Sequence, residues 1–174
     1  MTMRSTCAEP SSGPSGLDRE LLRDVLSSFP AGVVIVTALD GERPVGLTVN
    51  AFCSVSADPP LVLVCVDKGS NTLAAISDAG AFTVNILAAG REQLALLFAS
   101  KARDKFSALA WREAPGGAGG PVLSEDAAAY LACRVERAIE AGDHWIFIGA
   151  VSAAGVHEEP VPLLYHRRAF AALA

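Results

Sequence analysis

The stretch PVGLTVNAFCSVSADPP, from Pro44 to Pro60, has the alternating pattern of a single long β-strand. One set of alternate residues is apolar and predicts a buried face: Val45, Leu47, Val49, Ala51, Cys53, Val55 and Ala57. The other set is mostly short and hydrogen-bonding, without a charge before Asp58: Gly46, Thr48, Asn50, Phe52, Ser54 and Ser56. A strand face turned to water usually carries Lys or Glu. The second face therefore predicts a ligand lying along the strand, with a solvated face as the alternative.

The rest of the chain has the pattern of a mainly β protein. Strands follow one another through short turns such as Asp40-Gly41, and strict alternation of strands with helices is absent. Residues 61–66 are apolar on both faces and predict a buried central strand. We therefore expect an antiparallel barrel or sandwich with three peripheral helices. The helices are expected at 15–29, 72–80 and 91–100, and further strands at 32–38, 81–87, 127–142, 144–156 and 161–170.

Composition limits the kind of protein. The chain has 174 residues, 51% of them hydrophobic and 19% charged, with a formal net charge of −5. These values predict one folded domain, at 17–174, and argue against nucleic acid or an anionic membrane as partner. The Ser-, Gly- and Pro-rich residues 1–16 are expected to form a disordered tail without a secretory signal. Four cysteines without C-x-x-C spacing favour reduced thiols in a cytoplasmic protein.

The segment DKGSNT, residues 67–72, precedes an expected helix and offers a second candidate site. Ser70 or Asn71 is expected to cap the helix, which alone explains the residue types. A helix start with Lys68 and the hydroxyls of Ser70 and Thr72 nearby is also typical of phosphate binding. A ligand with a planar polar head and a phosphate tail would use this segment together with the polar strand face.

Other polar motifs carry weaker signals. The alternation of Lys101, Arg103 and Lys105 favours a solvated loop, with a phosphate contact from Lys101 as the alternative. The Gly-rich residues 116–120 are interpreted as a flexible connection. His144 alone is typical of a structural or exposed histidine, and the spacing of the histidines predicts no metal site. No acid–base constellation stands out, which favours either binding alone or chemistry carried by a cofactor.

Six segments, taken in order, resemble the flavin reductase-like family. They are FPAGVVIVTA, PVGLTVNAFCSVSADPPLVLVCVDKGSNT, AFTVNIL, LALLFASK with the later DKF, GDHWIFIGAV and PLLYHRR. The resemblance covers nearly all of residues 20–170. It implies a short-chain NAD(P)H:flavin oxidoreductase with an FMN-binding fold, an antiparallel Greek-key split β-barrel with peripheral α-helices.

The resemblance also implies where the flavin would lie. Contacts to the isoalloxazine ring and ribityl chain fall on Thr48, Asn50, Ala51, Phe52, Cys53 and Ser54. Ser56 reaches toward the phosphate, and the neighbouring strand end is formed by Cys65, Val66 and Asp67. The phosphate cradle corresponds to Lys68, Ser70, Asn71 and Thr72. The positions near the phosphate or adenine side correspond to Phe98 and Lys101.

The nicotinamide side is implied in the same way. It is bordered by His144 and by the segment Tyr165, His166, Arg167 and Arg168, with His144 expected to orient the nicotinamide or shield the hydride path. The chain has Arg168 where the family often has glycine, which puts the choice of nicotinamide cofactor in doubt. Trp145 is bulkier than expected for its position.

The implied activity is hydride transfer from NADH or NADPH to FMN or FAD. The resemblance further implies a homodimer that supplies reduced flavin, as a dissociable substrate, to a separate flavin-dependent monooxygenase. Two alternatives stay open. One is a flavin-binding carrier or sensor without reductase activity. The other is a split barrel whose polar face binds haem or a deazaflavin.

Overall fold

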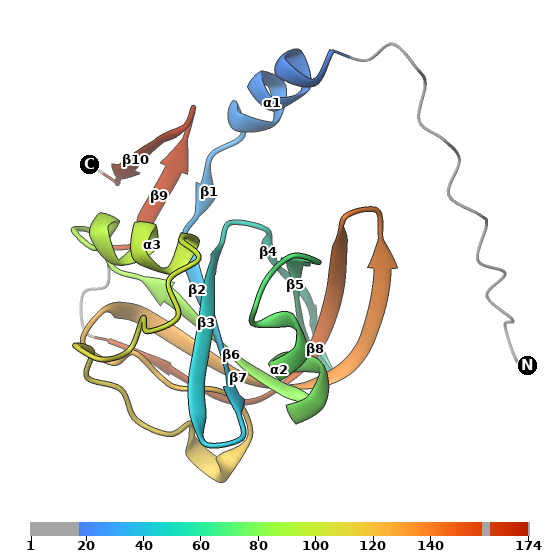
Figure 1. Cartoon of the computed structure of the whole chain (residues 1–174), viewed down its shortest axis with the longest axis vertical. Helices are drawn as coiled ribbons and strands as arrows, with labels where there is room; N and C mark the ends of the chain where they lie inside the picture. Colours follow the sequence, from blue (N-terminus) through green and yellow to red (C-terminus); the bar gives the residue numbers. More distant parts are fainter. Residues whose placement is uncertain (1–17, 158–160, 174) are drawn as a thin grey trace, which may run out of the picture.

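The computed structural model describes residues 18–157 and 161–173, so the predicted tail at 1–16 lies outside the described residues. The chain forms an open barrel of β-strands with helices at its ends (Figure 1). The helices are α1 (Arg19–Ser27), α2 (Leu73–Ala79) and α3 (Glu92–Ala99), with a 3-10 turn at Pro115–Gly117. The strands are β1 (Ala31–Gly32), β2 (Val34–Asp40), β3 (Arg43–Val49), β4 (Phe52–Ala57), β5 (Pro60–Asp67), β6 (Ala81–Leu87), β7 (Ala127–Ala141), β8 (His144–Val156), β9 (Leu163–His166) and β10 (Ala169–Ala172).

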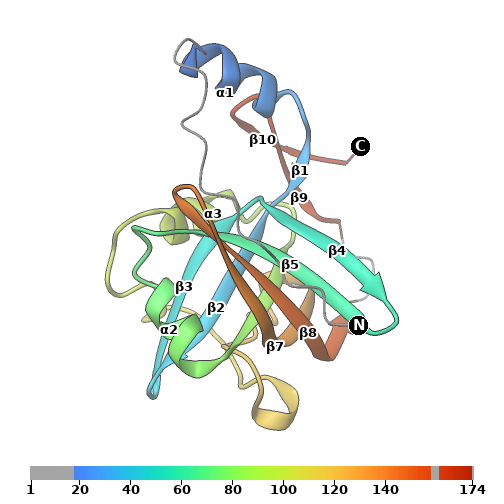
Figure 2. The same cartoon turned by 90° about the vertical axis from the view of Figure 1, so that its right-hand side faces the viewer.

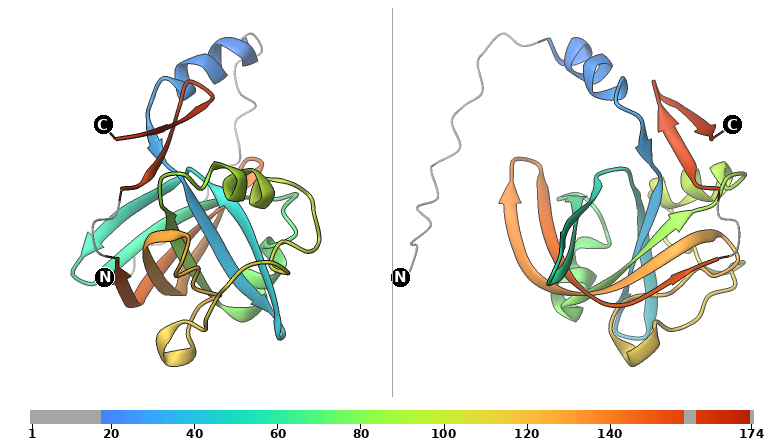
Figure 3. Two further views of the ribbon diagram at one scale, coloured as in Figure 1. Left: turned by 90° about the vertical axis from the view of Figure 1, so that its left-hand side faces the viewer. Right: turned by 180° about the vertical axis from the view of Figure 1, so that it is seen from behind.

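The main sheet has seven antiparallel strands in the order β3-β2-β6-β7-β8-β5-β4. The strands β3 and β4, consecutive in the chain, therefore lie at the two opposite ends of the sheet. A smaller sheet, in the order β1-β9-β10, pairs the first strand, β1, with the last two, β9 and β10 (Figure 3). This architecture confirms the expected antiparallel split barrel.

The stretch from Pro44 to Pro60 is not one strand, and this prediction is wrong. The link at Asn50 and Ala51 carries the chain from one end of the sheet to the other. Val49 is buried, whereas on β4 the side chain that packs against the core is Phe52. The inward face thus changes phase at the link. The expected burial of the later apolar set also fails, because Ala51, Cys53, Val55 and Ala57 are exposed.

The barrel interior is filled from both ends of the sheet. Strand β2 is buried along most of its length because both of its neighbours, β3 and β6, pair with it. Its core partners include Val64 of β5, Phe82 of β6 and Phe147 of β8. In Figure 2, β4 and β5 lie next to the long β7–β8 hairpin, and β5 pairs with β8. Dense burial of these apolar side chains is what holds the open sheet in shape.

A buried polar seam ties the loop after α3 to the barrel. We use "polar seam" for Thr37, Thr83 and Asn85 together with residues 120–123, which they bond. The Asn85 Nδ2 donates to Pro121 O and its Oδ1 accepts from Leu123 N, at 3.2 and 2.9 Å. Thr37 Oγ1 donates to Pro121 O at 2.6 Å, and all three side chains are fully buried.

The glycine-rich residues 116–120 are not simply a flexible connection, contrary to the prediction. A Cβ on Gly120 would lie 2.3 Å from the Thr37 carbonyl carbon and oxygen. Such an approach is possible only for glycine, and it lets the loop lie directly on β2. Thr83 Oγ1 also donates to Gly120 O at 2.8 Å. The end of this segment is therefore fixed against the sheet.

The helix α1 lies apart from the barrel, beside the β9–β10 hairpin (Figures 1 and 3). It begins at the N-cap Asp18, whose side chain accepts from Glu20 N at 2.8 Å. The helix has no buried residue, and Phe29 just beyond it is 78% exposed. Its apolar face is therefore uncovered within the described single chain.

Candidate functional site

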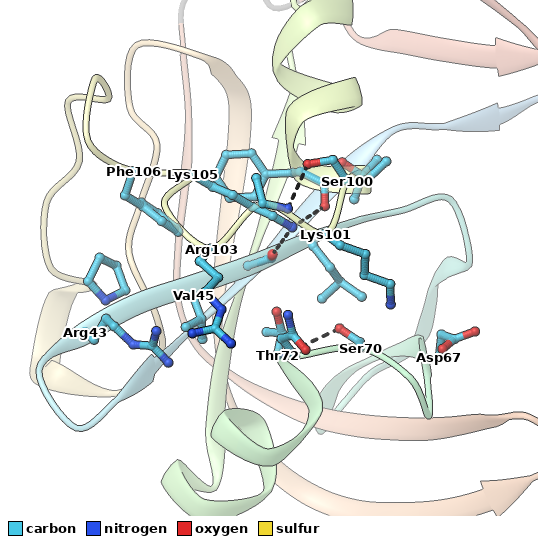
Figure 4. A pocket seen from close by; sticks show the side chains of 18 residues that line it. Arg43, Val45, Asp67, Ser70, Thr72, Ser100, Lys101, Arg103, Lys105 and Phe106 are labelled. Atoms are coloured by element: carbon cyan, nitrogen blue, oxygen red, sulfur yellow. Dashed lines mark hydrogen bonds between the residues drawn. The ribbon is translucent and has the colours of Figure 1, made fainter.

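A cavity of about 620 Å³ lies where β3, the turn before α2 and the end of α3 meet (Figure 4). We call it the basic cavity. The loop that follows α3 closes its remaining side. The lining residues are Arg43, Pro44, Val45, Gly46, Leu47, Thr48, Asp67, Ser70, Asn71, Thr72, Phe98, Ala99, Ser100, Lys101, Ala102, Arg103, Lys105 and Phe106.

One wall is built by α3 packing closely on β3. A Cβ on Gly46 would lie 2.8 Å from Phe98 Cε1, so glycine is needed for the helix to approach this closely. Thr48 Oγ1 donates to the Ala95 carbonyl at 2.6 Å and fixes the helix along the strand. Lys105 Nζ donates to the carbonyls of Gly46 and Phe98, at 3.2 and 2.8 Å. The Lys105 side chain thus joins the loop to both elements.

The opposite wall is the turn from β5 into α2. Gly69 N donates to Asp67 Oδ1 at 2.6 Å, and Thr72 N donates to Ser70 Oγ at 3.2 Å. Thr72 is the N-cap residue and makes no side-chain cap, so the expected capping by Ser70 or Asn71 is wrong. Lys101 Nζ donates to Gly69 O at 2.8 Å and connects the two walls. The Ser70 hydroxyl hydrogen is left available to a ligand.

The charges around the cavity are strongly unbalanced. Arg43, Lys101, Arg103 and Lys105 line it against a single carboxylate, Asp67. Burial, and secondly the charge of Lys101, lowers the pKa of Lys105 below its usual range. In a chain with a net charge of −5, this concentration of cations makes the cavity a candidate anion-binding site. Residues 101–104 form an exposed loop, as expected, but Lys101, Arg103 and the half-buried Lys105 also line the cavity.

The predicted ring-binding residues of β4 and β5 do not line this cavity but lie beside it. Cys65 N donates to Ala51 O at 3.0 Å, and Asp67, two residues further along β5, belongs to the cavity wall. The residues placed here are Asn50, Ala51, Phe52, Cys53, Ser54, Ser56, Cys65 and Val66. Phe52, Ser56 and Cys65 are half-buried, and the side chain of Val66 is fully buried, so only its main chain can face a ligand.

His144 lies near the cavity, whereas Lys68 points elsewhere. His144 begins β8 directly opposite Asp67 in the ladder, and side chains at opposite positions share one face of a sheet. Its Nδ1 is 2.7 Å from Asp143 Oδ1, and this hydrogen bond, followed by the histidine's charge, lowers the pKa of Asp143. Lys68 Nζ lies 2.5 Å from Glu140 Oε1 and is absent from the cavity lining.

The segment from Tyr165 to Arg168 lies at the β9–β10 hairpin, next to α1. Its arginines border a smaller cavity of about 290 Å³ together with Asp24 and Ser27 of α1 and the C-cap residue Ser28. Arg168 Nη2 lies 2.8 Å from Asp24 Oδ1, and Arg167 N donates to Ser27 O at 2.8 Å. Both arginines have positive φ, +48° and +63°. Neither these arginines nor Tyr165 and His166 line the basic cavity.

The sequence places this architecture in a known family. The family model described as "flavin reductase like domain" matches residues 26–174, which include the basic cavity and every described strand. The chain belongs to the flavin reductase-like family. Within this family, the basic cavity and the β4–β5 surface become candidates for one continuous flavin site.

Individual relatives agree with this membership. A flavin reductase (NADH) from Kitasatospora aureofaciens is 46% identical over 162 residues, covering 91% of this chain and 83% of the relative. HsaB of Rhodococcus jostii, the reductase subunit of a flavin-dependent monooxygenase, is 38% identical and covers 87% of this chain and 76% of its own. The NADH:FAD oxidoreductase SgcE6 of Streptomyces globisporus, solved with NAD and FAD fragments, superposes with a TM-score of 0.84 at 38% identity, covering 90% of this chain and 93% of that one.

The donors around the cavity fit a flavin phosphate. Seven predicted flavin-site residues line it: Thr48, Asp67, Ser70, Asn71, Thr72, Phe98 and Lys101. Ammonium, hydroxyl and main-chain N–H groups are the donors that phosphate oxygens require. The prediction missed Arg43, Gly46, Arg103, Lys105 and Phe106 as lining residues. The alternation of charges at 101–105 was the available signal, but a loop sequence alone does not say which side faces a cavity.

The remaining features of the described chain add two facts. Within residues 18–157 and 161–173, no group of three or more His, Cys, Asp or Glu side chains is placed to hold a metal ion. None of the described helices is long and apolar enough to cross a membrane.

Proposed function

We propose that this chain transfers a hydride from NADH or NADPH to FMN or FAD and passes the reduced flavin to a separate monooxygenase. The observation that carries the proposal is the basic cavity, which adjoins the strand pair β4–β5. Main-chain groups on the outer edge of β4 have no partner strand in the described sheet. Relatives named as NADH-dependent flavin reductases and as monooxygenase reductase subunits support it.

The chain's own residues would bind and position the flavin. Ser70 Oγ and Lys101 Nζ present a hydroxyl and an ammonium to a phosphate at the Asp67 side of the cavity. Within the described part of the chain, the edge strand β4 pairs only with β5, so its outer main-chain groups are open to the ring. These fixed dipoles stabilise negative charge better than reorienting water does.

A bound flavin and nicotinamide would supply the redox chemistry, hydride transfer from nicotinamide C4 to flavin N5. The chain's own residues would hold the two rings in contact. We propose that His144, which shares a face with Asp67, borders the nicotinamide. Its hydrogen bond with Asp143 restricts the orientation of the imidazole ring.

Steady-state oxidation of both nicotinamides with both flavins tests the proposal. We expect oxidation that depends on added flavin and saturates with it. Lys101→Met should raise the KM for flavin about tenfold, since one charge-assisted phosphate contact is lost. Lys68→Met is the matched control, because Lys68 pairs with Glu140 outside the cavity lining. Flavin binding without flavin-dependent oxidation would instead identify a carrier or sensor.

We also propose that the chain forms a homodimer. The exposed apolar side chains are concentrated on α1 and its end: Leu21, Leu22, Val25, Leu26 and Phe29. Val55 on β4 and Ile139 on β7 add partly exposed apolar surface. Light scattering should give twice the chain mass of 18.0 kDa. A monomer at assay concentrations would remove this part of the proposal. The cytoplasmic location expected from the sequence stays a prediction.

A further inference from the structure

The basic cavity is long in one direction, along β3. Its lining includes every residue from Arg43 to Thr48. Five steps along a strand, at about 3.3 Å each, give a length of roughly 16 Å. A single phosphate group with its short ribityl chain fills only part of such a length.

The two ends of the cavity are distinct. The Asp67 end adjoins β4 and β5, where Cys65 N bonds Ala51 O. Figure 4 shows Arg43 and Arg103 on the other side of the cavity, with Thr72 and Ser70 lying between them and Asp67. A ligand whose ring lies on β4 therefore enters at the Asp67 end. Only a longer extension of the same ligand reaches the two arginines.

The arginines at the far end are available to such an extension. Within the described residues, Arg103 has neither an ion-pair partner nor a side-chain hydrogen bond. Arg43 pairs with Asp40 at 2.5 Å, but both side chains are more than half exposed, so the pair is weak. Two guanidinium groups at one end of a cavity match the geometry of phosphate oxygens. The nearer cations, Lys101 and Lys105, are already bonded to main-chain carbonyls.

We propose that the Arg43–Arg103 end of the basic cavity binds the adenylate phosphate of FAD, so that this chain uses FAD in preference to FMN. FMN ends at its first phosphate and would leave these arginines without a partner, whereas FAD continues into a second phosphate and an adenosine. The inference rests on the proposed function, because it assumes that the cavity is the flavin site.

An adenylate phosphate is also present in NADH, so the test must separate the two sources. Equilibrium dissociation constants for FAD, FMN and NADH are measured by fluorescence titration or dialysis, without turnover. The variants are Arg103→Met and Arg43→Met. Arg134→Met is the matched control, because it removes the same charge from an exposed site on β7 outside the cavity lining.

The unmodified protein should bind FAD about tenfold more tightly than FMN, the size expected for one charge-assisted phosphate contact. Arg103→Met should remove most of that difference by weakening FAD alone, with Arg43→Met acting in the same direction. The Arg134→Met control should leave all three affinities unchanged.

Three results would overturn the inference: equal affinity for the two flavins in the unmodified protein, equal weakening of both flavins by Arg103→Met, or weakening of NADH alone. If the protein binds FAD selectively yet fails to oxidise NADH, the proposed reductase function fails while the inference about the arginines stands. Binding and turnover therefore report on the two claims separately.

Discussion

The polar seam and the basic cavity both bring polar side chains against a loop, but they leave those side chains in different states. In the seam, Thr37, Thr83 and Asn85 are fully buried and every one is hydrogen-bonded. In the cavity, Arg103 has no ion-pair partner within the described chain. Complete pairing stabilises a fold, whereas donors left open beside a cavity are suited to a ligand.

The largest expected effect on stability comes from Gly120→Ala in the polar seam. The added Cβ would lie 2.3 Å from the Thr37 carbonyl, so the loop must move and its bonds to Thr37, Thr83 and Asn85 must break. We expect the free energy of unfolding to fall by about 4 kcal/mol, measured by urea denaturation. Gly32→Ala is the control, because nothing lies within 4 Å of its Cβ and its φ is not positive.

Asn85→Leu removes the polar groups at the centre of the seam while keeping a side chain with the same branching and number of heavy atoms. The Leu123 N–H would lose its acceptor inside the protein. We expect a loss of about 3 kcal/mol of stability, from unpaired buried groups. Asn50→Leu, at an exposed site, should change the stability by less than about 0.5 kcal/mol. Equal unfolding midpoints for the two variants would contradict a structural role for the seam.

Lys105→Met tests both regions at once, because Lys105 lines the basic cavity but, like the residues of the polar seam, is hydrogen-bonded within the protein. Its Nζ donates to two main-chain carbonyls, those of Gly46 and Phe98. We expect both a loss of about 1.5 kcal/mol of stability and weaker flavin binding. A variant that binds flavin normally would assign Lys105 to structure alone. Thermal unfolding with and without flavin separates the two effects.

Cys133 differs from the seam residues because its side chain is fully buried but has no strong hydrogen-bond partner. Burial raises the pKa of its thiol from 9.0 to about 12. Above pH 9 the unfolded chain therefore binds fewer protons than the folded one at this site. Stability should fall by about 1 kcal/mol over the first pH unit above that value, and Cys133→Ala should remove this part of the slope. Identical pH slopes for the two proteins would contradict the expected shift.

Much of the fold could be predicted because its signals are local. The Asp40-Gly41 turn joins β2 to β3 as expected, and Gly80 ends α2 with a φ of +60°. The strand at 81–87 has the expected bounds. The error in the stretch from Pro44 to Pro60 has a physical reason. The apolar–polar alternation of the sequence runs on across Asn50 and Ala51, although the face that points inward changes there. Sequence periodicity also does not show which edge of the sheet a strand joins.

The candidate site could be predicted only in part. Ser70 and Thr72 were found because hydroxyls at the start of a helix have a recognisable chemistry, whereas Lys68, the cation of the same motif, lies outside the cavity lining. Lys101 lies in the loop after α3, and only the family resemblance placed it near the phosphate. Arg43 and Arg103 were missed as site residues because their role depends on a loop folding back over β3, a contact between distant segments. The polar seam left no sequence signal either, because buried Thr and Asn on strands look like ordinary surface residues until their partners are known.

The pairing of β1 with β9 has a consequence for how the chain is made. Ala31 lies opposite Tyr165, more than a hundred residues later in the chain. During synthesis, therefore, β1 has no strand partner among the described residues until β9 has also left the ribosome. Closing so long a loop is slow compared with forming the local hairpins. We expect the seven-stranded barrel to assemble first and the attachment of the N-terminal helix to be the last and most easily reversed step of folding.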